Sequence, residues 1–185
     1  MVIPWSETEF QFTEKHQARP AAGILTVNDR VCALGAGAGE VFGILDIGRG
    51  RWPYQTQWNW GGGAGDSSTG EQVGIQTGGK WNDGTGFTEN GIFVNGRLHK
   101  LSEDLEWHYD WDDPMQPWRV RSADRSFNLT LVPIHDRHAT ISLGVLSNEV
   151  HQVFGHWSGS VPDGAGGSLT VDGIFGFAEE ARARW

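Results

Sequence analysis

Turn signals recur along this sequence at short, strand-like intervals, and they limit the chain to a fold built from many short strands. Asn, Asp, Gly and Pro form the clearest reversals, which lie at residues 27–31, 94–97, 122–126, 161–164 and 171–174. Apolar and polar residues alternate with period two at 127–131 and 141–145. Because no stretch carries an apolar helical stripe long enough for a crossover between parallel strands, the sequence predicts an antiparallel all-β barrel or sandwich.

Two kinds of segment depart from this pattern. Residues 177–185 are rich in Ala, Glu and Arg, so we expect a short C-terminal helix there. The glycine-rich runs Gly35–Gly39 and Gly61–Gly65 do not open a helix, which argues against phosphate-binding loops. They predict flexible loops or a close approach of two backbones. With no linker in view, residues 1–185 are predicted to form a single domain.

Composition excludes several classes of protein. The chain has 185 residues and a net charge of −9, without a basic cluster, which argues against nucleic-acid binding. It has no apolar stretch near the ~20 residues of a membrane span, and its single cysteine excludes an intrachain disulfide. The first residues do not resemble a signal peptide, so we expect a cytoplasmic protein.

Residues 78–91 are the segment richest in functional groups, and they lead into a predicted hairpin. A two-residue turn at Asn95–Gly96 pairs Val94 with Arg97, and continuing the register brings Glu89 diagonal to Lys100 and Asn90 diagonal to His99. Alternation places Glu89 and Lys100 on one face of the hairpin and Asn90 and His99 on the other. Either face can point inward, and a buried Glu–Lys pair can serve structure alone.

The seven histidines of the chain are potential metal ligands. His135 and His138 lie on opposite faces of any strand that contains both, and the same holds for His151 and His156. Neither pair is a chelate, and we expect no metal site and no cofactor. A metal site assembled from distant strands stays open as the alternative.

Ten tryptophans are an unusual number for a chain of this length. Several of them are predicted to line a cavity for a large apolar ligand, or to act as stacking platforms for sugars beside paired carboxylates. The simpler interpretation is that each indole fills the core and that its N–H finds a partner.

Several motifs together resemble an uncharacterised bacterial family, domain of unknown function 2804. They are 49–54, 58–60, 78–86, 88–90, 96–100, 151–155 and 176–180. The family is similar to a calycin-like group that includes hydroxyneurosporene synthase, a carotenoid hydratase. This resemblance implies a lipocalin-like barrel with a cavity for apolar substrates. It also implies that the chain corresponds to the C-terminal half of members about twice as long, in which case a homodimer is expected to complete the pocket.

The sequence therefore predicts a barrel that binds a hydrophobic or amphipathic small molecule, either as a cofactor-free hydratase, isomerase or cyclase or as a carrier without chemistry. A glycoside hydrolase is the third possibility. The candidate proton-transfer residues are Glu89, Asp83, His99 and His151. The candidate ligand-binding residues are Lys80, Asn90, Trp58, Trp60, Trp81, Lys100 and Gln152.

Overall fold

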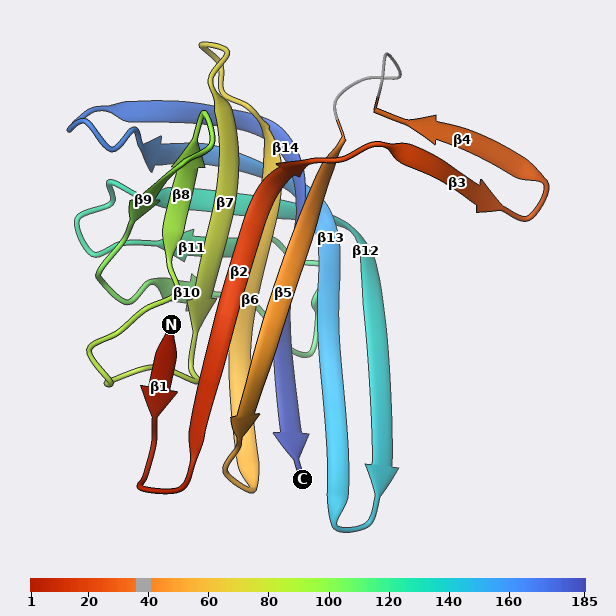
Figure 1. Ribbon diagram of the computed structural model, residues 1–185, viewed down its shortest axis with the longest axis vertical. Coiled ribbons are helices and arrows are strands. Elements are labelled where there is room, and N and C mark those ends of the chain that lie inside the picture. Colours follow the sequence, from red (N-terminus) through yellow and green to blue (C-terminus); the bar gives the residue numbers. More distant parts are fainter. Residues whose placement is uncertain (36–40) are drawn as a thin grey trace.

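The computed structural model describes residues 1–35 and 41–185, so most of the run Gly35–Gly39 lies outside the described residues. The largest element is a nine-stranded antiparallel sheet with the order β10-β11-β12-β13-β14-β6-β7-β8-β9. Its strands are β6 (Gln55–Asp66), β7 (Gln72–Gly79), β8 (Gly91–Val94), β9 (Arg97–Lys100), β10 (Glu106–His108), β11 (Trp118–Arg121), β12 (Asn128–Leu143), β13 (Leu146–Pro162) and β14 (Ser168–Arg184). The long strands β12, β13 and β14 bend over, so that the sheet curls into a half-barrel (Figure 1).

The hydrophobic core occupies one face of the curled sheet. Trp118 and Trp157 are fully buried there with Ile75, Ile92 and Leu129. The indole of Trp157 donates to the carbonyl of Gly62 over 3.1 Å, and that of Trp118 donates to the carbonyl of Pro114 over 2.9 Å. For these two residues, the simpler interpretation of a satisfied core tryptophan is confirmed.

A second, three-stranded sheet covers part of the other face. It consists of β1 (Val2–Pro4), β2 (Phe10–Pro20) and β5 (Phe42–Arg51) in the order β1-β2-β5. β2 contacts β6 and β7, and Figure 1 shows β2 and β5 in front of β6. A β-carbon added to Gly74 would lie 2.8 Å from that of Ala18, and one added to Gly62 would lie 3.0 Å from Nε2 of Gln17. The run Gly61–Gly65 is therefore a strand that permits a close approach of the second sheet, as one of the two interpretations predicted.

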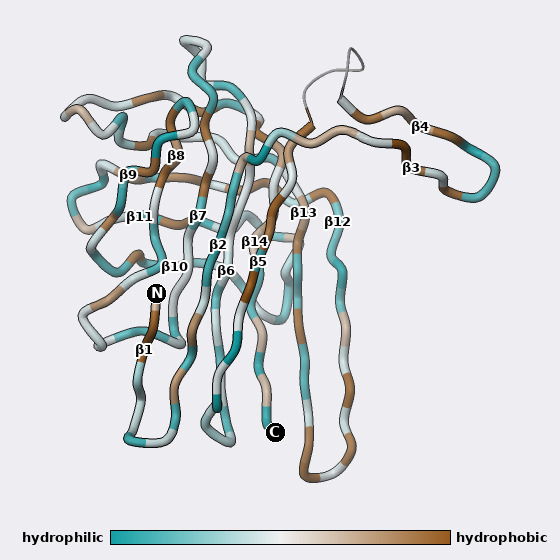
Figure 2. The backbone as a smooth tube through the Cα atoms, in the orientation of Figure 1, coloured by the Kyte–Doolittle hydropathy of each residue, from teal (hydrophilic) through white to brown (hydrophobic). Residues whose placement is uncertain are grey.

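The hairpin of β3 (Gly23–Val27) and β4 (Arg30–Leu34) projects from the rest of the molecule (Figure 1). Its turn confirms the reversal predicted at 27–31. The tube of Figure 2 is largely brown along both strands, and Ile24 and Val31 are exposed.

Two predicted elements are wrong. Residues 177–184 belong to β14, where they pair with β13 on one side and β6 on the other, and the described residues contain no helix. The preference of Ala, Glu and Arg for helix is a few tenths of a kcal/mol per residue, which two full ladders of backbone hydrogen bonds outweigh. The reversal predicted at 171–174 is also absent. β14 continues through it with Gly173 at a φ of 73°, near the irregularity in β13 between Trp157 and Gly159.

The other predicted reversals at 94–97, 122–126 and 161–164 all fall between strands. The described part of the chain contains no helix long and apolar enough to cross a membrane.

Candidate functional site

A cavity of about 560 Å³ lies between the two sheets, and we call it the inter-sheet cavity. β2 contributes Gln11, Thr13 and Lys15 to its wall, and β5 contributes Asp46. The opposite wall comes from the nine-stranded sheet and from the segment between β7 and β8. The remaining lining residues are Trp52, Trp58, Trp60, Trp81, Glu89, Glu179 and Trp185. Five indoles and four ionisable side chains therefore surround the same space.

Glu89 is one of two cavity acids with a buried side chain, which is 5% exposed. Its Oε1 accepts a hydrogen bond of 2.7 Å from the indole of Trp81, and its Oε2 lies 3.9 Å from Nζ of Lys15. Burial raises the pKa of Glu89, an effect that Lys15 and the Trp81 hydrogen bond reduce but do not cancel. A β-carbon on Gly78 would overlap the Glu89 carboxylate, so glycine at this position makes the room that Glu89 occupies.

Glu179 is a second buried acid, and it reaches the cavity from β14. Its Oε1 accepts a hydrogen bond of 2.8 Å from the indole of Trp58, and its Oε2 accepts one of 2.7 Å from Nε2 of Gln152. Burial raises the pKa of Glu179, and the hydrogen bond from Trp58 opposes the rise. The cavity thus holds two carboxyl groups that retain a proton at a higher pH than ordinary glutamates.

Lys15 is the cation of the inter-sheet cavity. Its Nζ lies 2.8 Å from Oδ1 of Asp46 and 4.7 Å from the centroid of the Trp60 ring. The ion pair and the aromatic face hold the ammonium group in place. With Asp46 neutralising Lys15, the two glutamates add negative charge to an otherwise aromatic cavity whenever they ionise.

The indoles of this region pack against one another. The centroid of the Trp52 ring lies 5.7 Å from the ring centroid of Trp58, 6.2 Å from that of Trp81 and 5.2 Å from that of Trp5. The Trp5 indole donates to the carbonyl of Trp81, and the Trp52 indole donates to Oε1 of Gln11. Because each indole is fixed by neighbours and by a hydrogen bond, the aromatic wall is preorganised.

The structure brings together five of the residues singled out from the sequence. Trp58, Trp60, Trp81 and Glu89 line the inter-sheet cavity, and Gln152 reaches it through its hydrogen bond to Glu179.

Two further candidates, Lys100 and Asn90, hold the segment that carries Glu89. The ammonium group of Lys100 donates to the carbonyls of Thr88 and Asn90 over 2.6 and 2.9 Å, and burial lowers its pKa. Oδ1 of Asn90 accepts from the backbone N–H of Gly78 over 2.8 Å. A smaller cavity of about 230 Å³ is lined by Glu89 and Lys100 among others, so Glu89 lies at the boundary of both cavities.

The predicted hairpin register at Asn95–Gly96 is confirmed, since Val94 pairs with Arg97 and Gly91 pairs with Lys100. The structure does not confirm Lys100 as the ion-pair partner of Glu89. Lys15, from the second sheet, is the ammonium group within 4 Å of the Glu89 carboxylate, whereas Lys100 turns to backbone carbonyls. Both faces of the hairpin region point inward, because Ile92 lies in the main core while Glu89 lines the inter-sheet cavity.

The remaining four candidates lie elsewhere. Asp83 is exposed and accepts from the backbone N–H of Lys80 in a turn, and Nζ of Lys80 lies 3.0 Å from Oε1 of Glu180. His151 contacts Asp136 at 2.8 Å, away from the residues that line the cavity.

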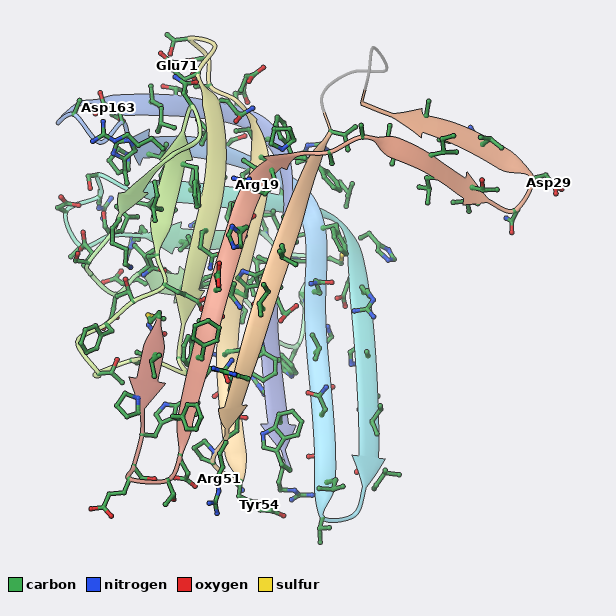
Figure 3. All side chains as sticks on the ribbon, viewed as in Figure 1. Arg19, Asp29, Arg51, Tyr54, Glu71 and Asp163 are labelled. Atoms are coloured by element: carbon green, nitrogen blue, oxygen red, sulfur yellow. The ribbon has the colours of Figure 1, made fainter. Side chains whose placement is uncertain are left out.

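His99 packs against Gly164, beside Asp163. Figure 3 labels Asp163 at the end of the molecule opposite Tyr54, whose carbonyl accepts from the backbone N–H of the cavity residue Trp185.

Lys15, Asp46 and Glu179 were missed in the sequence. One signal was present, since Gln11, Thr13, Lys15 and Gln17 alternate with other residues along β2 and place polar side chains on a single face. A polar face of a strand normally points to solvent, and here a second sheet covers it.

The fold and the cavity together define an all-β protein with a tryptophan-lined, carboxylate-bearing cavity between two antiparallel sheets. The family model described as Domain of unknown function (DUF2804) matches residues 1–185, so the chain belongs to this family, as its motifs predicted. A search of curated proteins finds no significant match, and neither does a search of solved structures.

Proposed function

We propose that the inter-sheet cavity binds a hydrophobic or amphipathic small molecule and that Glu89 transfers a proton to or from it without a cofactor. The observation that carries the proposal is the pair of buried glutamates with raised pKa in a cavity walled by five indoles. A cavity of this size and character suits a ligand with an apolar body and few polar groups. The lipocalin-like, hydratase-related group remains the proposed relationship.

The proposed chemistry is the hydration, isomerisation or cyclisation of an unsaturated ligand. Protonated Glu89 donates its proton to one carbon of a double bond, and the indole faces stabilise the positive charge on the other. In a hydration, water adds to that carbon and releases a proton to the ionised carboxylate of Glu179, and Glu89 regains its proton from solvent. In an isomerisation, a carbon–hydrogen bond next to that carbon gives its proton to the same carboxylate. The raised pKa of Glu89 supports the role of acid, because it keeps the carboxyl protonated nearer to neutral pH.

A carrier without chemistry is the first alternative, and the same cavity supports it. A glycoside hydrolase has less support. The indoles of Trp52, Trp58 and Trp81 pack on one another edge-on or tilted rather than presenting open platforms on which a sugar could stack.

Binding is tested by titrating the protein with retinol, an isoprenoid alcohol that accepts energy from excited tryptophan. Thr13, which is buried in the cavity wall, is replaced by Trp to fill the cavity. Thr170→Trp, at an exposed position of β14, adds the same group outside it. We expect saturable energy transfer in the native protein and in Thr170→Trp, and a loss of at least about tenfold in affinity in Thr13→Trp. Equal binding by both variants would refute the cavity as the binding site, and saturation by a cello-oligosaccharide instead of retinol would support the hydrolase.

Proton transfer is tested by incubating the protein with unsaturated isoprenoids in D₂O and measuring deuterium in the recovered ligand by mass spectrometry. We expect incorporation with the native protein and a decrease of about 10²-fold or more with Glu89→Gln, which keeps the size of the side chain but cannot transfer a proton. Saturable binding without incorporation would identify a carrier.

Two further expectations remain proposals. The exposed apolar residues of the β3–β4 hairpin, Ile24, Leu25 and Val31, support the predicted homodimer. Native mass spectrometry of the purified protein gives the oligomeric state and any ligand that co-purifies. The cytoplasmic location is tested by cell fractionation.

A further inference from the structure

Four ionisable side chains project from one face of the β12–β13 ladder, far along the sequence from the segment that carries Glu89. His138 pairs directly with His151. Asp136 precedes His138 by two residues and Glu149 precedes His151 by two, so period-two alternation places all four on the same face. Gln152, the next residue after His151, points to the opposite face and reaches Glu179 in the inter-sheet cavity.

The two imidazole rings are parallel, with centroids 4.2 Å apart and an interplanar angle of 3°. Nε2 of His138 lies 3.1 Å from Oε1 of Glu149. One ligand atom from each of His138, Glu149 and His151 can be chosen so that all three lie within 4.8 Å of one another. Tetrahedral coordination at about 2.1 Å brings ligand atoms to about 3.4 Å from each other, so binding requires the two imidazoles to rotate out of their parallel stack and aim one nitrogen each at the ion.

Asp136 orients the imidazole of His151. Its Oδ2 lies 2.8 Å from Nδ1 of His151, which holds the proton on Nδ1 and leaves Nε2 as a free electron pair. The other oxygen, Oδ1, is buried and has no hydrogen-bond partner among the described residues. A carboxylate bound to the far nitrogen of a histidine is the usual second contact of a metal-binding imidazole.

An aromatic ring and a cation flank the cluster. The ring centroids of His151 and Trp111 lie 4.5 Å apart in a T-shaped arrangement, and the guanidinium carbon of Arg182 lies 3.7 Å from the centroid of the Trp111 ring. The charge of Arg182 is paired with Glu180, whose carboxylate its Nε contacts at 2.7 Å. The side chains of His138 and Glu149 are each 43% exposed and that of His151 is 11% exposed, so the site opens to water on one side.

We propose that His138, Glu149 and His151 bind a divalent first-row transition-metal ion, of which Zn²⁺ is the probe, with Asp136 orienting His151. Two imidazoles and one carboxylate are ligands that such ions prefer, and three protein ligands leave a coordination position for water. The sequence left open a metal site assembled from distant strands, but it did not indicate this pair, because it does not show that His138 faces His151. It is independent of the proposed ligand in the inter-sheet cavity.

The proposal is tested on tag-free, chelator-treated protein by calorimetric titration with ZnCl₂ and by the visible absorption of bound Co²⁺. We expect one Zn²⁺ per chain with a micromolar dissociation constant, and a tetrahedral Co²⁺ spectrum. Affinity should decrease at least tenfold in His138→Gln, Glu149→Gln and His151→Gln, and about tenfold in Asp136→Asn.

His135→Gln is the matched control, because His135 is an exposed histidine on the same strand. It should bind Zn²⁺ as the native protein does. Because the His138 side chain is 43% exposed and lies outside the core, His138→Gln should keep the native circular dichroism spectrum, so a loss of binding there is not a loss of the fold. Binding weaker than millimolar in the native protein, or unchanged binding in His138→Gln and His151→Gln, would overturn the proposal.

Discussion

Replacing Gln76 by Leu is expected to destabilise the interface between the two sheets. Gln76 is 3% exposed on β7. Its Oε1 accepts hydrogen bonds of 2.7 Å from Nε2 of Gln17 and 3.1 Å from the indole of Trp60. Leu has a similar volume, but it accepts neither hydrogen bond, so two donors lose their partner between packed sheets. Leu also cannot donate to Oε2 of Glu89, as Nε2 of Gln76 does over 3.4 Å.

A buried donor left without a partner costs about 1–3 kcal/mol. Two such donors give about 2–6 kcal/mol, and the burial of an apolar side chain in place of a polar one offsets part of it. We therefore expect the free energy of unfolding to decrease by about 3 kcal/mol. With a urea m-value of about 2 kcal/mol/M, the midpoint of the transition should decrease by about 1.5 M.

Urea unfolding followed by tryptophan fluorescence measures this change. Gln72→Leu serves as the control, because Gln72 lies on the same strand and its side chain makes no hydrogen bond in the described part of the chain. We expect it to change stability by less than about 0.5 kcal/mol. A decrease in Gln76→Leu no larger than in this control would refute the hydrogen-bonded role of Gln76.

Other predictions follow from the same geometry. Because burial raises the folded-state pKa of Glu89, its carboxyl group favours folding below the unfolded-state pKa of 4.5 and loses that contribution as the pH rises. Glu89→Gln should therefore be more stable than the native protein at pH 8 and nearly equally stable at pH 4. Thermal unfolding of both proteins at the two pH values measures the difference. Gly74→Val should decrease the free energy of unfolding in urea by about 1–3 kcal/mol, because its β-carbon would lie 2.8 Å from the β-carbon of Ala18 on β2. Gly23→Val should leave the free energy of unfolding unchanged, because nothing lies within 4 Å of the added β-carbon. Burial alone would raise the pKa of Glu180, but hydrogen bonds from Arg182, Tyr109, Lys80 and Gln57 outweigh it and lower the pKa. Lys80→Met should therefore cost about 1.5–3 kcal/mol at pH 7, and much less in a Glu180→Gln background, where the carboxylate is absent. An equal loss in both backgrounds, measured by urea unfolding, would contradict the charge-based reasoning.

Local signals predicted some elements of the fold well. The Asn95–Gly96 turn fixes its own register, because the backbone of that turn dictates which residues face each other, and the pairs from Val94–Arg97 to Gly91–Lys100 follow. The family was likewise predicted from motifs spread along the chain. In contrast, the helix predicted at residues 177–184 is wrong. The helix propensity of these residues is a local property, whereas their strand conformation is set by pairing with β13 and β6, which come from other parts of the sequence.

Part of the site was also within reach of the sequence. Glu89, Trp58, Trp60 and Trp81 were singled out because acids and indoles concentrate near Gly78–Gly91. Lys15 was not, because nothing near it indicates that the polar face of its strand is covered by another sheet. The environment of Glu180 was not predicted for the same reason, because side chains from distant segments, among them Gln57 and Lys80, contact its carboxylate.

The sequence by itself determined the all-β class and the register of the Asn95–Gly96 hairpin, because turn geometry and side-chain alternation are properties of neighbouring residues. It also indicated some of the acids and indoles that line the cavity. Only the tertiary structure decided which of these residues meet. The packing of β2 across β6 and β7 placed Lys15 beside Glu89, and the pairing of β12 with β13 placed His138 against His151. Such contacts join residues many positions apart, and they exist only when the sheets pack against each other and bury polar groups that a single strand would expose to water.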